Sequence, residues 1–346
     1  MNRNEEILAL VRPNIRALSP YSTARDEFGG KLGVFLDANE SPYQNGWNRY
    51  PDPRQQALKK RIGAWKGIGA EQIFLGNGSD EAIDLLFRIF CRPGVDNAVA
   101  ISPSYGMYAV AAAINDVPLR EVPLAEDFSL RPKALLQACD AQTKLLFLCS
   151  PNNPTGNAFP RPDIRALLAH FGGILVVDEA YADFSEAGSL LAELPQWPRL
   201  VILQTCSKAR GLAALRLGMA FADPLIIQLM SQVKYPYNIN EATQRLAMEA
   251  LSQPMDAQVR EIVAERGRVA RMLASFPFVR KVYPSDANFL LVRVDDADAL
   301  YEHLIADGII VRNRNRVPLC RGCLRITIGL QAENDKLLTS LQAYAK

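Results

Sequence analysis

The chain has 346 residues, and 39 Lys and Arg nearly balance 37 Asp and Glu to leave a formal net charge of +2. This balance provides no extended basic surface and argues against nucleic acid as a partner. Hydrophobic residues make up 49% of the chain, which excludes a largely disordered protein, and the length predicts two domains.

The sequence also predicts where the protein works. No apolar run reaches the roughly 18 residues that a membrane-spanning helix needs. The segment Met1-Asn-Arg-Asn-Glu-Glu6 lacks the charged and then apolar form of a signal peptide. We therefore expect a cytoplasmic protein without a membrane partner.

Cysteine and histidine usage predicts no metal site. Six cysteines in a chain of this length do not indicate a disulfide scaffold. The pair Cys320-Arg-Gly-Cys323 has metal or redox spacing, but no second pair exists, and the only histidines, His170 and His303, are distant in sequence. Zinc or thioredoxin-like chemistry is therefore not expected.

The predicted elements begin with a short helix pattern at Glu5–Val11 and a proline-punctuated arm, after which strands and helices alternate from Leu58 onward. The predicted strands are Gln72–Leu75, Asn97–Ile101, Lys144–Cys149, Ile174–Val177, Arg199–Gln204 and Leu217–Ala222. Helical patterns between them include Asp80–Phe90, Tyr105–Ile114, Arg131–Ala138 and Pro162–Phe171. Short apolar strands separated by amphipathic helices predict an α/β fold with a mostly parallel sheet covered on both faces.

After Asn240 the pattern changes to an α+β unit. A long helical stretch, Ala242–Ser275, is interrupted near Pro254. It is followed by strands Val279–Tyr283 and Phe289–Val294, helix Ala297–Ala306, strands Ile309–Arg312 and Cys323–Ile328, and a terminal helix. We predict an arm that forms part of the small domain at 1–35, a large domain at 36–240 and a small domain at 241–346.

Polar residues follow the predicted strands where a parallel sheet binds its ligands. Gly76-Asn-Gly-Ser-Asp-Glu81 leads into a helix whose N-terminus suits a phosphate, although Ser79 or Asp80 could be an ordinary N-cap. Tyr105, in Ser102-Pro-Ser-Tyr105-Gly, could stack on a planar cofactor or simply begin the next helix. Asn153, in Ser150-Pro-Asn-Asn-Pro-Thr-Gly156, could donate its amide to a phenolate oxygen or only form a turn.

Asp178 ends a buried strand in Ile174-Leu-Val-Val-Asp178-Glu-Ala-Tyr181. A carboxylate at that place is costly unless it is paired, and a protonated pyridine nitrogen would pair it. Tyr181, three residues further on, could donate its phenol to an oxygen on the same ring. The alternative is a solvated loop acid.

Lys208 lies in Thr205-Cys-Ser-Lys-Ala-Arg-Gly-Leu-Ala-Ala-Leu-Arg216, just after a predicted strand. Alone it would be read as a solvated loop lysine. A lysine amine can form a Schiff base with an aldehyde, and Thr205, Ser207 and Arg216 offer donors suited to a phosphate. A protein that binds pyridoxal phosphate needs an amine for the aldehyde and, beside it, a binding site for the phosphate.

Three further segments are ambiguous on their own. Asn39 and Tyr50 lie in a proline-rich stretch before the sheet, in Asn39-Glu-Ser-Pro and Arg49-Tyr-Pro-Asp-Pro53, and such stretches are usually surface loops. Arg325 lies in a predicted strand of the second unit and could be an ion-pair partner or the anchor for an anionic substrate group.

Together these segments resemble the histidinol-phosphate aminotransferases, a branch of the class II, fold-type I aminotransferases that use pyridoxal phosphate. The resemblance spans nearly the whole chain and rests on Asn39-Glu-Ser-Pro, Arg49-Tyr-Pro-Asp-Pro, Gly78-Ser-Asp-Glu, Ser150-Pro-Asn-Asn-Pro-Thr-Gly, Asp178-Glu-Ala-Tyr, Ser207-Lys with Arg216, and Leu324-Arg-Ile-Thr-Ile-Gly. The turn after the lysine departs from the family, because Arg210 and Ala214 replace the usual aromatic residue and glycine.

The resemblance implies a role for each matching residue. The fold would be a seven-stranded, mostly parallel sheet in a large domain beside a smaller α+β domain. Lys208 would form the Schiff base and move the proton, Asp178 would bind the ring nitrogen, and Tyr105 would stack on the ring. The remaining cofactor contacts would be Tyr181 and Asn153 to O3′, and Ser79, Asp80, Thr205, Ser207 and Arg216 to the phosphate, the first two through their backbone N–H groups. Substrate contacts would come from Tyr21, Asn39, Arg312 and Arg325, and Tyr50 would reach the neighbouring subunit's cofactor and substrate in a homodimer.

The implied reaction is a ping-pong transamination between glutamate and imidazole acetol phosphate, which gives 2-oxoglutarate and histidinol phosphate in histidine biosynthesis. Arg325 would then hold the substrate phosphate, since histidinol phosphate carries no carboxylate. Three alternatives stay open: an aromatic or branched-chain aminotransferase, a lyase similar to threonine-phosphate decarboxylase, and a regulatory domain that binds pyridoxal phosphate. The chain has no segment or length to spare for the DNA-binding module that such a regulator would carry.

Overall fold

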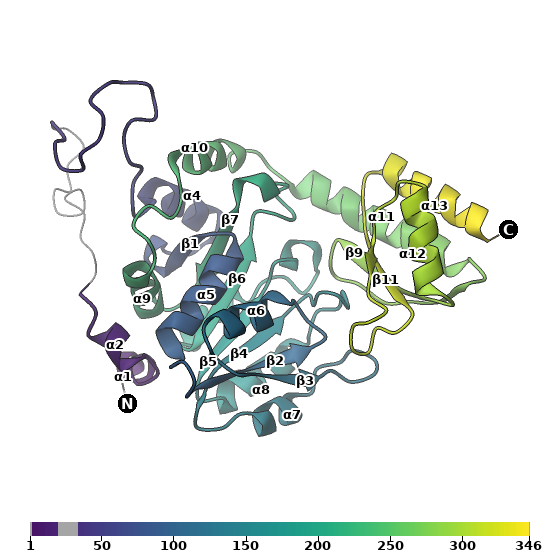
Figure 1. The fold of residues 1–346 in the computed structure, drawn as a ribbon, viewed down its shortest axis with the longest axis horizontal. Helices are drawn as coiled ribbons and strands as arrows, with labels where there is room; N and C mark the ends of the chain where they lie inside the picture. Colours follow the sequence, from purple (N-terminus) through teal and green to yellow (C-terminus); the bar gives the residue numbers. More distant parts are fainter. Residues whose placement is uncertain (1, 20–33, 346) are drawn as a thin grey trace.

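The computed structural model describes residues 2–19 and 34–345, so Tyr21 lies outside the described residues. Two units, each built on one sheet, make up the molecule (Figure 1). A segment at residues 34–50 extends along one side of the larger unit, and the C-terminus lies at the far end of the smaller one.

The larger unit is built on seven strands, β1 (Ile73–Asn77), β2 (Asn97–Ser102), β3 (Leu119–Pro123), β4 (Thr143–Cys149), β5 (Ile174–Asp178), β6 (Leu200–Thr205) and β7 (Leu217–Phe221). Their order across the sheet is β1-β7-β6-β5-β4-β2-β3. Every neighbouring pair is parallel except the two that involve β7, which runs antiparallel to β1 and β6. The predicted fold class, with its mostly parallel seven-stranded sheet, is confirmed.

Both faces of this sheet are buried. Along β5, Leu175 and Val177 join one hydrophobic cluster, whereas Ile174 and Val176 join the other. The alternation follows from the two-residue period of a strand and explains why the central positions of β4, β5 and β6 are apolar on both faces. The first cluster is completed by α4 (Gln56–Lys66), α7 (Pro132–Ala138), α8 (Arg161–His170) and α10 (Glu241–Ala250), and the second by α1 (Arg3–Leu8), α2 (Pro13–Arg16), α5 (Ser79–Phe90), α6 (Met107–Ile114) and α9 (Pro224–Val233).

The smaller unit has a four-stranded sheet with its own hydrophobic cluster. Its strands run in the order β10-β11-β9-β8, and every pair is antiparallel. The elements are α11 (Asp256–Ala274), β8 (Val279–Val282), β9 (Phe289–Val294), α12 (Ala297–Ala306), β10 (Arg312–Asn313), β11 (Cys323–Thr327) and α13 (Gln331–Tyr344). The domain boundaries after residues 35 and 240 stay a prediction.

The structure refines the predicted elements in three places. The helical stretch from 242 to 275 is two helices, α10 and α11, which separate around Pro254 as the interruption indicated. The expected strand at Ile309–Arg312 was misplaced, since β10 covers only Arg312–Asn313. Edge strand β3 was not predicted, because Leu119-Arg-Glu-Val-Pro carries two exposed charged residues and little apolar signal. No helix formed by the described residues is both long and apolar enough to cross a membrane.

Candidate active site

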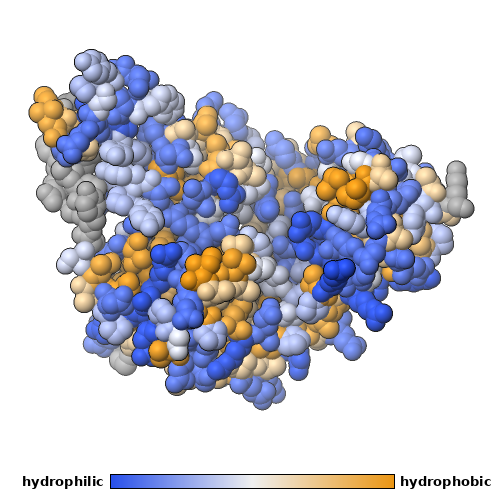
Figure 2. All heavy atoms as spheres, viewed as in Figure 1, coloured by the Kyte–Doolittle hydropathy of each residue, from blue (hydrophilic) through white to orange (hydrophobic). Residues whose placement is uncertain are grey.

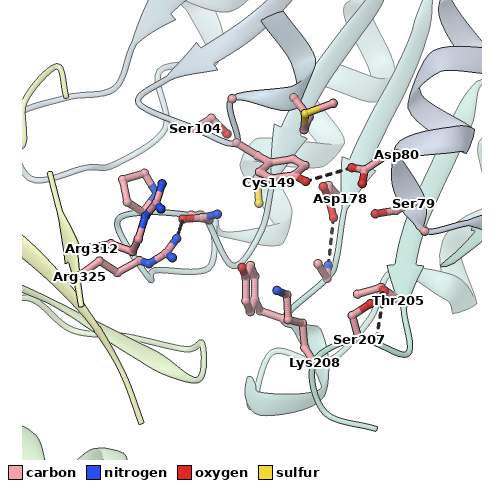
Figure 3. Close-up of a pocket in the computed structure, with 18 of the residues that line it drawn as sticks. Ser79, Asp80, Ser104, Cys149, Asp178, Thr205, Ser207, Lys208, Arg312 and Arg325 are labelled. Atoms are coloured by element: carbon pink, nitrogen blue, oxygen red, sulfur yellow. Dashed lines mark hydrogen bonds between the residues drawn. The ribbon is translucent and has the colours of Figure 1, made fainter. Parts of the chain in front are cut away.

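A cavity of about 650 Å³ opens where β4, β5 and β6 end, and the smaller unit contributes one side of it. Figure 3 shows Arg312 and Arg325 on one side, Ser79, Thr205 and Ser207 on the other, and Asp178 and Lys208 between them. The cavity brings together twelve residues that the sequence singled out: Ser79, Asp80, Tyr105, Asn153, Asp178, Tyr181, Thr205, Ser207, Lys208, Arg216, Arg312 and Arg325.

Lys208 lies in the connection between β6 and β7. The backbone N–H of Cys206 donates to the carbonyl oxygen of Leu217 at 3.0 Å, which closes the base of this connection. The Lys208 amine opens into the cavity, 5.7 Å from the centre of the Tyr181 ring, and has no hydrogen-bond or ion-pair partner among the described residues. Burial, and then the nearby Arg325 guanidinium, lower the pKa of this amine, so a larger share of it is free to react.

Asp178 is the last residue of β5 and its side chain is buried. The Tyr108 hydroxyl donates to one carboxylate oxygen at 2.9 Å, and the backbone N–H of Ala180 donates to the other at 3.1 Å. Burial raises the pKa of Asp178 to about 6, and these two hydrogen bonds act in the opposite direction. No cation of the described residues lies at hydrogen-bond distance, so a buried acid is left for a ligand to pair.

A concentration of hydrogen-bond donors surrounds the start of α5. Gly78 provides the N-cap without a side-chain hydrogen bond, so the first N–H groups of this 12-residue helix remain available to an anion. A Cβ atom at Gly218 would overlap the backbone of Gly78 and Ser79, so glycine allows β7 to approach the helix end. Thr205 and Ser207 place two hydroxyl groups 3.0 Å apart at the end of β6.

Arg216 completes this donor cluster. Its carbonyl oxygen accepts a 2.6 Å hydrogen bond from the backbone N–H of Gly78, which ties the start of β7 to the start of α5. Its guanidinium lies 3.5 Å from the Asp80 carboxylate, a loose contact that leaves most of its donors unused. The helix N-terminus, two hydroxyl groups and a guanidinium together form a site suited to a phosphate ester.

The remaining predicted residues lie between the two sides of the cavity. The Tyr105 hydroxyl donates to Asp80 at 3.0 Å and fixes the tyrosine at the edge of the cavity. The Arg325 guanidinium donates to the side-chain oxygen of Asn153 and thereby links the two units. The Tyr181 ring packs edge-on against Phe289, with ring centres 5.2 Å apart, and its hydroxyl has no partner among the described residues.

Asn39 and Tyr50 lie elsewhere. They line a second cavity of about 470 Å³ that shares no lining residue with the first. The Glu40 carboxylate accepts from Arg49 at 2.7 Å and from the backbone N–H of Tyr50 at 2.6 Å, so the two N-terminal motifs lie against each other. Tyr50 stacks on Tyr237 with ring centres 4.4 Å apart, and 49% of its surface is exposed.

The sequence analysis missed two residues that the site contains. Tyr108 is buried within the apolar helix α6, where nothing in the sequence marks it as a partner of Asp178. Arg314 also lines the cavity. Its signal was present in the alternating run Arg312-Asn-Arg-Asn-Arg316, but the predicted strand ended at Arg312.

The residues of the first cavity fit a planar, phosphorylated pyridine that carries an aldehyde. Asp178 supplies a buried acid for a ring nitrogen, and Lys208 supplies a free amine for the aldehyde. The helix end with its hydroxyl groups and Arg216 supplies a phosphate site. No three His, Cys, Asp or Glu side chains in residues 2–19 and 34–345 are placed to hold a metal ion.

Residues 34–341 match the family described as aminotransferase class I and II. Because the match covers most of the chain, this protein belongs to that family. The fold and the free lysine beside a phosphate site agree with the assignment.

Individual relatives of this chain belong to one kind of aminotransferase. The chain is 55% identical over 98% of its length to a histidinol-phosphate aminotransferase of Parabacteroides distasonis, of which 99% is covered. It is 52% identical over 97% of its length to the Bacteroides fragilis protein of the same name, of which 98% is covered. The solved histidinol-phosphate aminotransferase of Sinorhizobium meliloti, in complex with pyridoxal-5'-phosphate, shares the fold with a TM-score of 0.79 at 25% identity, covering 96% of both chains.

Proposed function

We propose that this protein is a pyridoxal-phosphate-dependent aminotransferase that interconverts imidazole acetol phosphate and histidinol phosphate, with glutamate and 2-oxoglutarate as the second pair. Full-length relatives of that name at about half identity carry the proposal. The cavity supports it, because a free amine and a buried acid lie between two separate groups of anion-binding residues.

The first group of residues would hold the cofactor. Bound pyridoxal phosphate supplies an electron sink, which makes the Cα–H bond of an amine substrate acidic. Asp178 would hold the proton on the ring nitrogen, and Tyr181 and Asn153 would donate to the ring's O3′. Ser79 and Asp80, through their backbone N–H groups, and Thr205, Ser207 and Arg216 would hold the phosphate, with Tyr105 against the ring. Tyr181 and Asn153 each have a donor unused by the described residues, as these roles require.

Lys208 would carry the proton. Its Nζ would accept the Cα proton of the amine substrate and return it as the ammonium, acting first as base and then as acid. The lowered pKa of this amine favours the first role, because more of it is unprotonated near neutral pH. Asp178, which lies with Lys208 between the two anion-binding groups in Figure 3, would keep its own negative charge by pairing with the ring nitrogen.

Arg312 and Arg325 would hold the substrate. β10 and β11 place them directly opposite each other, and Arg325 is further fixed by Asn153. Neither forms an ion pair with a carboxylate of the described residues. Two adjacent guanidinium groups without a counterion suit the phosphate of histidinol phosphate.

We further propose a cytoplasmic homodimer with shared sites. Tyr50 is half exposed in a segment that carries other exposed apolar side chains, including Leu36, Tyr43 and Trp47. Figure 2 shows a hydrophobic patch over α6, beside the first cavity, where Val110 and Ile114 are exposed. A second copy that covered these surfaces would bring its Tyr50 and Asn39 to the first cavity.

The function is tested with four substrates given to the purified protein loaded with cofactor. We expect 2-oxoglutarate-dependent turnover of histidinol phosphate, with far weaker activity on phenylalanine and tyrosine and no carbon dioxide from threonine phosphate. A preference for an aromatic amino acid would assign an aromatic aminotransferase instead, and release of carbon dioxide would assign a lyase. Sedimentation velocity measures the oligomeric state, and a monomer would contradict the shared site.

A further inference from the structure

Arg314 lies in the cavity beside the two arginines opposed in the small sheet. Its backbone N–H donates to the carbonyl oxygen of Cys323 at 2.9 Å, so the pairing of Arg312 with Arg325 and of Asn313 with Leu324 continues one residue past the end of β10. Side chains alternate along a strand, and directly opposed residues share a face. Arg312, Arg314 and Arg325 are therefore on one side of this sheet, and all three line the cavity.

The residues between these arginines, Asn313 and Asn315, face the other side of the sheet, as the alternation requires. The side-chain amides of Asn313 and Asn315 both donate to the Asp298 carboxylate, at 2.6 Å and 2.9 Å. Asp298 lies in the first turn of α12 and does not line the cavity. The segment is thus fixed from behind by its asparagines, which determines the side from which Arg314 projects.

The positive charge of Arg314 is not compensated by the protein. Arg314 forms no ion pair with a carboxylate of the described residues, and its buried Nε has no hydrogen-bond partner among them. Burial lowers its pKa, and the charges of Arg325 and Arg312 lower it further. Keeping three like charges together without a counterion is costly, so the arrangement is suited to an anionic ligand.

The number of donors favours a phosphate over a carboxylate. Each guanidinium offers five N–H donors, and two guanidinium groups already satisfy the two oxygens of a carboxylate. A phosphate monoester has three terminal oxygens and carries nearly two negative charges at neutral pH. The cofactor phosphate would occupy the donor cluster around Arg216, so a second phosphate is left for this side of the cavity.

We propose that Arg314 is a third ligand of the substrate's phosphate group and a determinant of the preference for phosphorylated amines. The inference rests on the proposed function for the identity of that substrate. Arg314 is an addition to the proposed function, because the family resemblance assigns substrate contacts to Arg312 and Arg325 but none to Arg314.

The test compares Arg314→Gln with Arg316→Gln in the protein loaded with cofactor. Arg316 is two residues away in the same segment, but it is exposed and does not line the cavity, so it controls for the loss of one positive charge. Two readouts are measured: the KM and kcat for histidinol phosphate and for L-histidinol, and the Kd of inorganic phosphate by calorimetry.

We expect Arg314→Gln to raise the KM for histidinol phosphate and the Kd of inorganic phosphate by about 10- to 100-fold. The kcat/KM for L-histidinol, which has no phosphate, should not change. Arg316→Gln should leave all values within about twofold. Arg314→Lys should recover part of the affinity, because it restores the charge without the planar fork.

Three results would overturn the inference. In the first, Arg314→Gln matches Arg316→Gln in phosphate affinity. In the second, it weakens histidinol and histidinol phosphate equally, which indicates a general structural defect. In the third, only the KM for 2-oxoglutarate rises, which assigns Arg314 to a carboxylate. Failure of the proposed function is distinct, because the wild-type protein would then not turn over histidinol phosphate, whereas phosphate calorimetry would still report on Arg314.

Discussion

The two sides of the active-site cavity are built on unlike supports. The cofactor side stands at the ends of β4, β5 and β6, whose central positions are fully buried between two layers of helices. The substrate side stands on β11, which carries Arg325, and on β10, a strand of only two residues, neither of them buried, with the turn that follows it. The cofactor side is positioned by the main hydrophobic core. On the substrate side β11 packs into the hydrophobic cluster of the smaller unit, whereas Arg312 and Arg314 are positioned by hydrogen bonds at the edge of its sheet.

This difference predicts different consequences of mutation. On the cofactor side, a substitution should remove chemistry while the surrounding sheet keeps its shape, since the sheet is held by apolar burial. On the substrate side, a substitution should alter affinity and specificity while leaving cofactor binding intact. Substitutions on each side of the cavity test that separation.

Lys208→Ala should abolish the reaction. Removing the acid–base group is expected to lower kcat by more than about 10⁴-fold, and borohydride should no longer fix the cofactor to the chain. Stopped assays and mass spectrometry of the reduced protein measure the two effects. Arg325→Ala serves as the control, because it should leave borohydride labelling at Lys208 unchanged. Residual labelling in the Lys208 variant would show that another lysine holds the cofactor.

Asp178→Asn should lower kcat by about 10²- to 10³-fold, because a charge placed to stabilise the transition state is lost. Although Asp178→Asn lowers activity, it should increase the stability of the cofactor-free protein. The carboxyl pKa is raised from 3.8 to about 6 on folding. In the cofactor-free protein its contribution to stability is therefore complete below pH 4 and is lost as the pH rises through 6.

The amide does not ionise, so cofactor-free Asp178→Asn should be more stable than the wild type at pH 8 by about 1–3 kcal/mol. At pH 4 the two proteins should be similar. Thermal melts of cofactor-free protein at both pH values measure the difference. An Asn variant that is less stable at pH 8 would mean that Asp178 is paired by a cation even without the cofactor.

Arg325→Gln should raise the KM for histidinol phosphate by about 10- to 100-fold through the loss of a charged hydrogen-bond donor. Arg312→Gln should have a smaller effect, because Arg312 is exposed at the rim and is not fixed by Asn153. Cofactor affinity, followed by its visible absorbance, should be unchanged in both. A loss of cofactor in either variant would show that the two sides are not separable.

Arg210→Ala should have the smallest effect. The Arg210 guanidinium lies 4.1 Å from the centre of the Trp65 ring and donates to the carbonyl oxygen of Gln253 at 2.7 Å, behind the turn that carries Lys208. Its loss should cost about 1 kcal/mol of stability. If the sheet positions Lys208, kcat should change little; a large fall in kcat would assign the positioning of the amine to this contact. Thermal melts and kinetics at saturating substrate decide between these outcomes.

The same contrast explains what the sequence could predict. Asp178 and Lys208 follow strongly apolar strands, so their place at one edge of the sheet could be inferred without coordinates. Arg314 could not be placed in this way, because its segment has no apolar strand pattern and its direction depends on pairing with a residue nine positions away. Tyr108 was missed because its hydroxyl group donates a hydrogen bond to Asp178, which lies 70 residues further along the chain.

The place of Asn39 and Tyr50 was not predictable for another reason. Within one chain they line a separate cavity, and in the proposed homodimer they would complete the partner's site. A sequence pattern can single out such residues, but it does not show whether they act within their own chain or, as proposed, across an interface between two copies.

In the alternating segment Arg312-Asn-Arg-Asn-Arg316, neighbouring side chains face opposite sides of the strand. Odd-numbered positions reach back to Asp298, and even-numbered positions up to Arg314 enter the cavity. Deleting a single residue here would exchange the two sets, turning amides toward the substrate and guanidinium groups toward α12, although the composition would hardly change. Removing an Asn–Arg pair would shorten the segment but would leave the remaining side chains facing the same sides as before. Length changes in this stretch should therefore be tolerated only in steps of two.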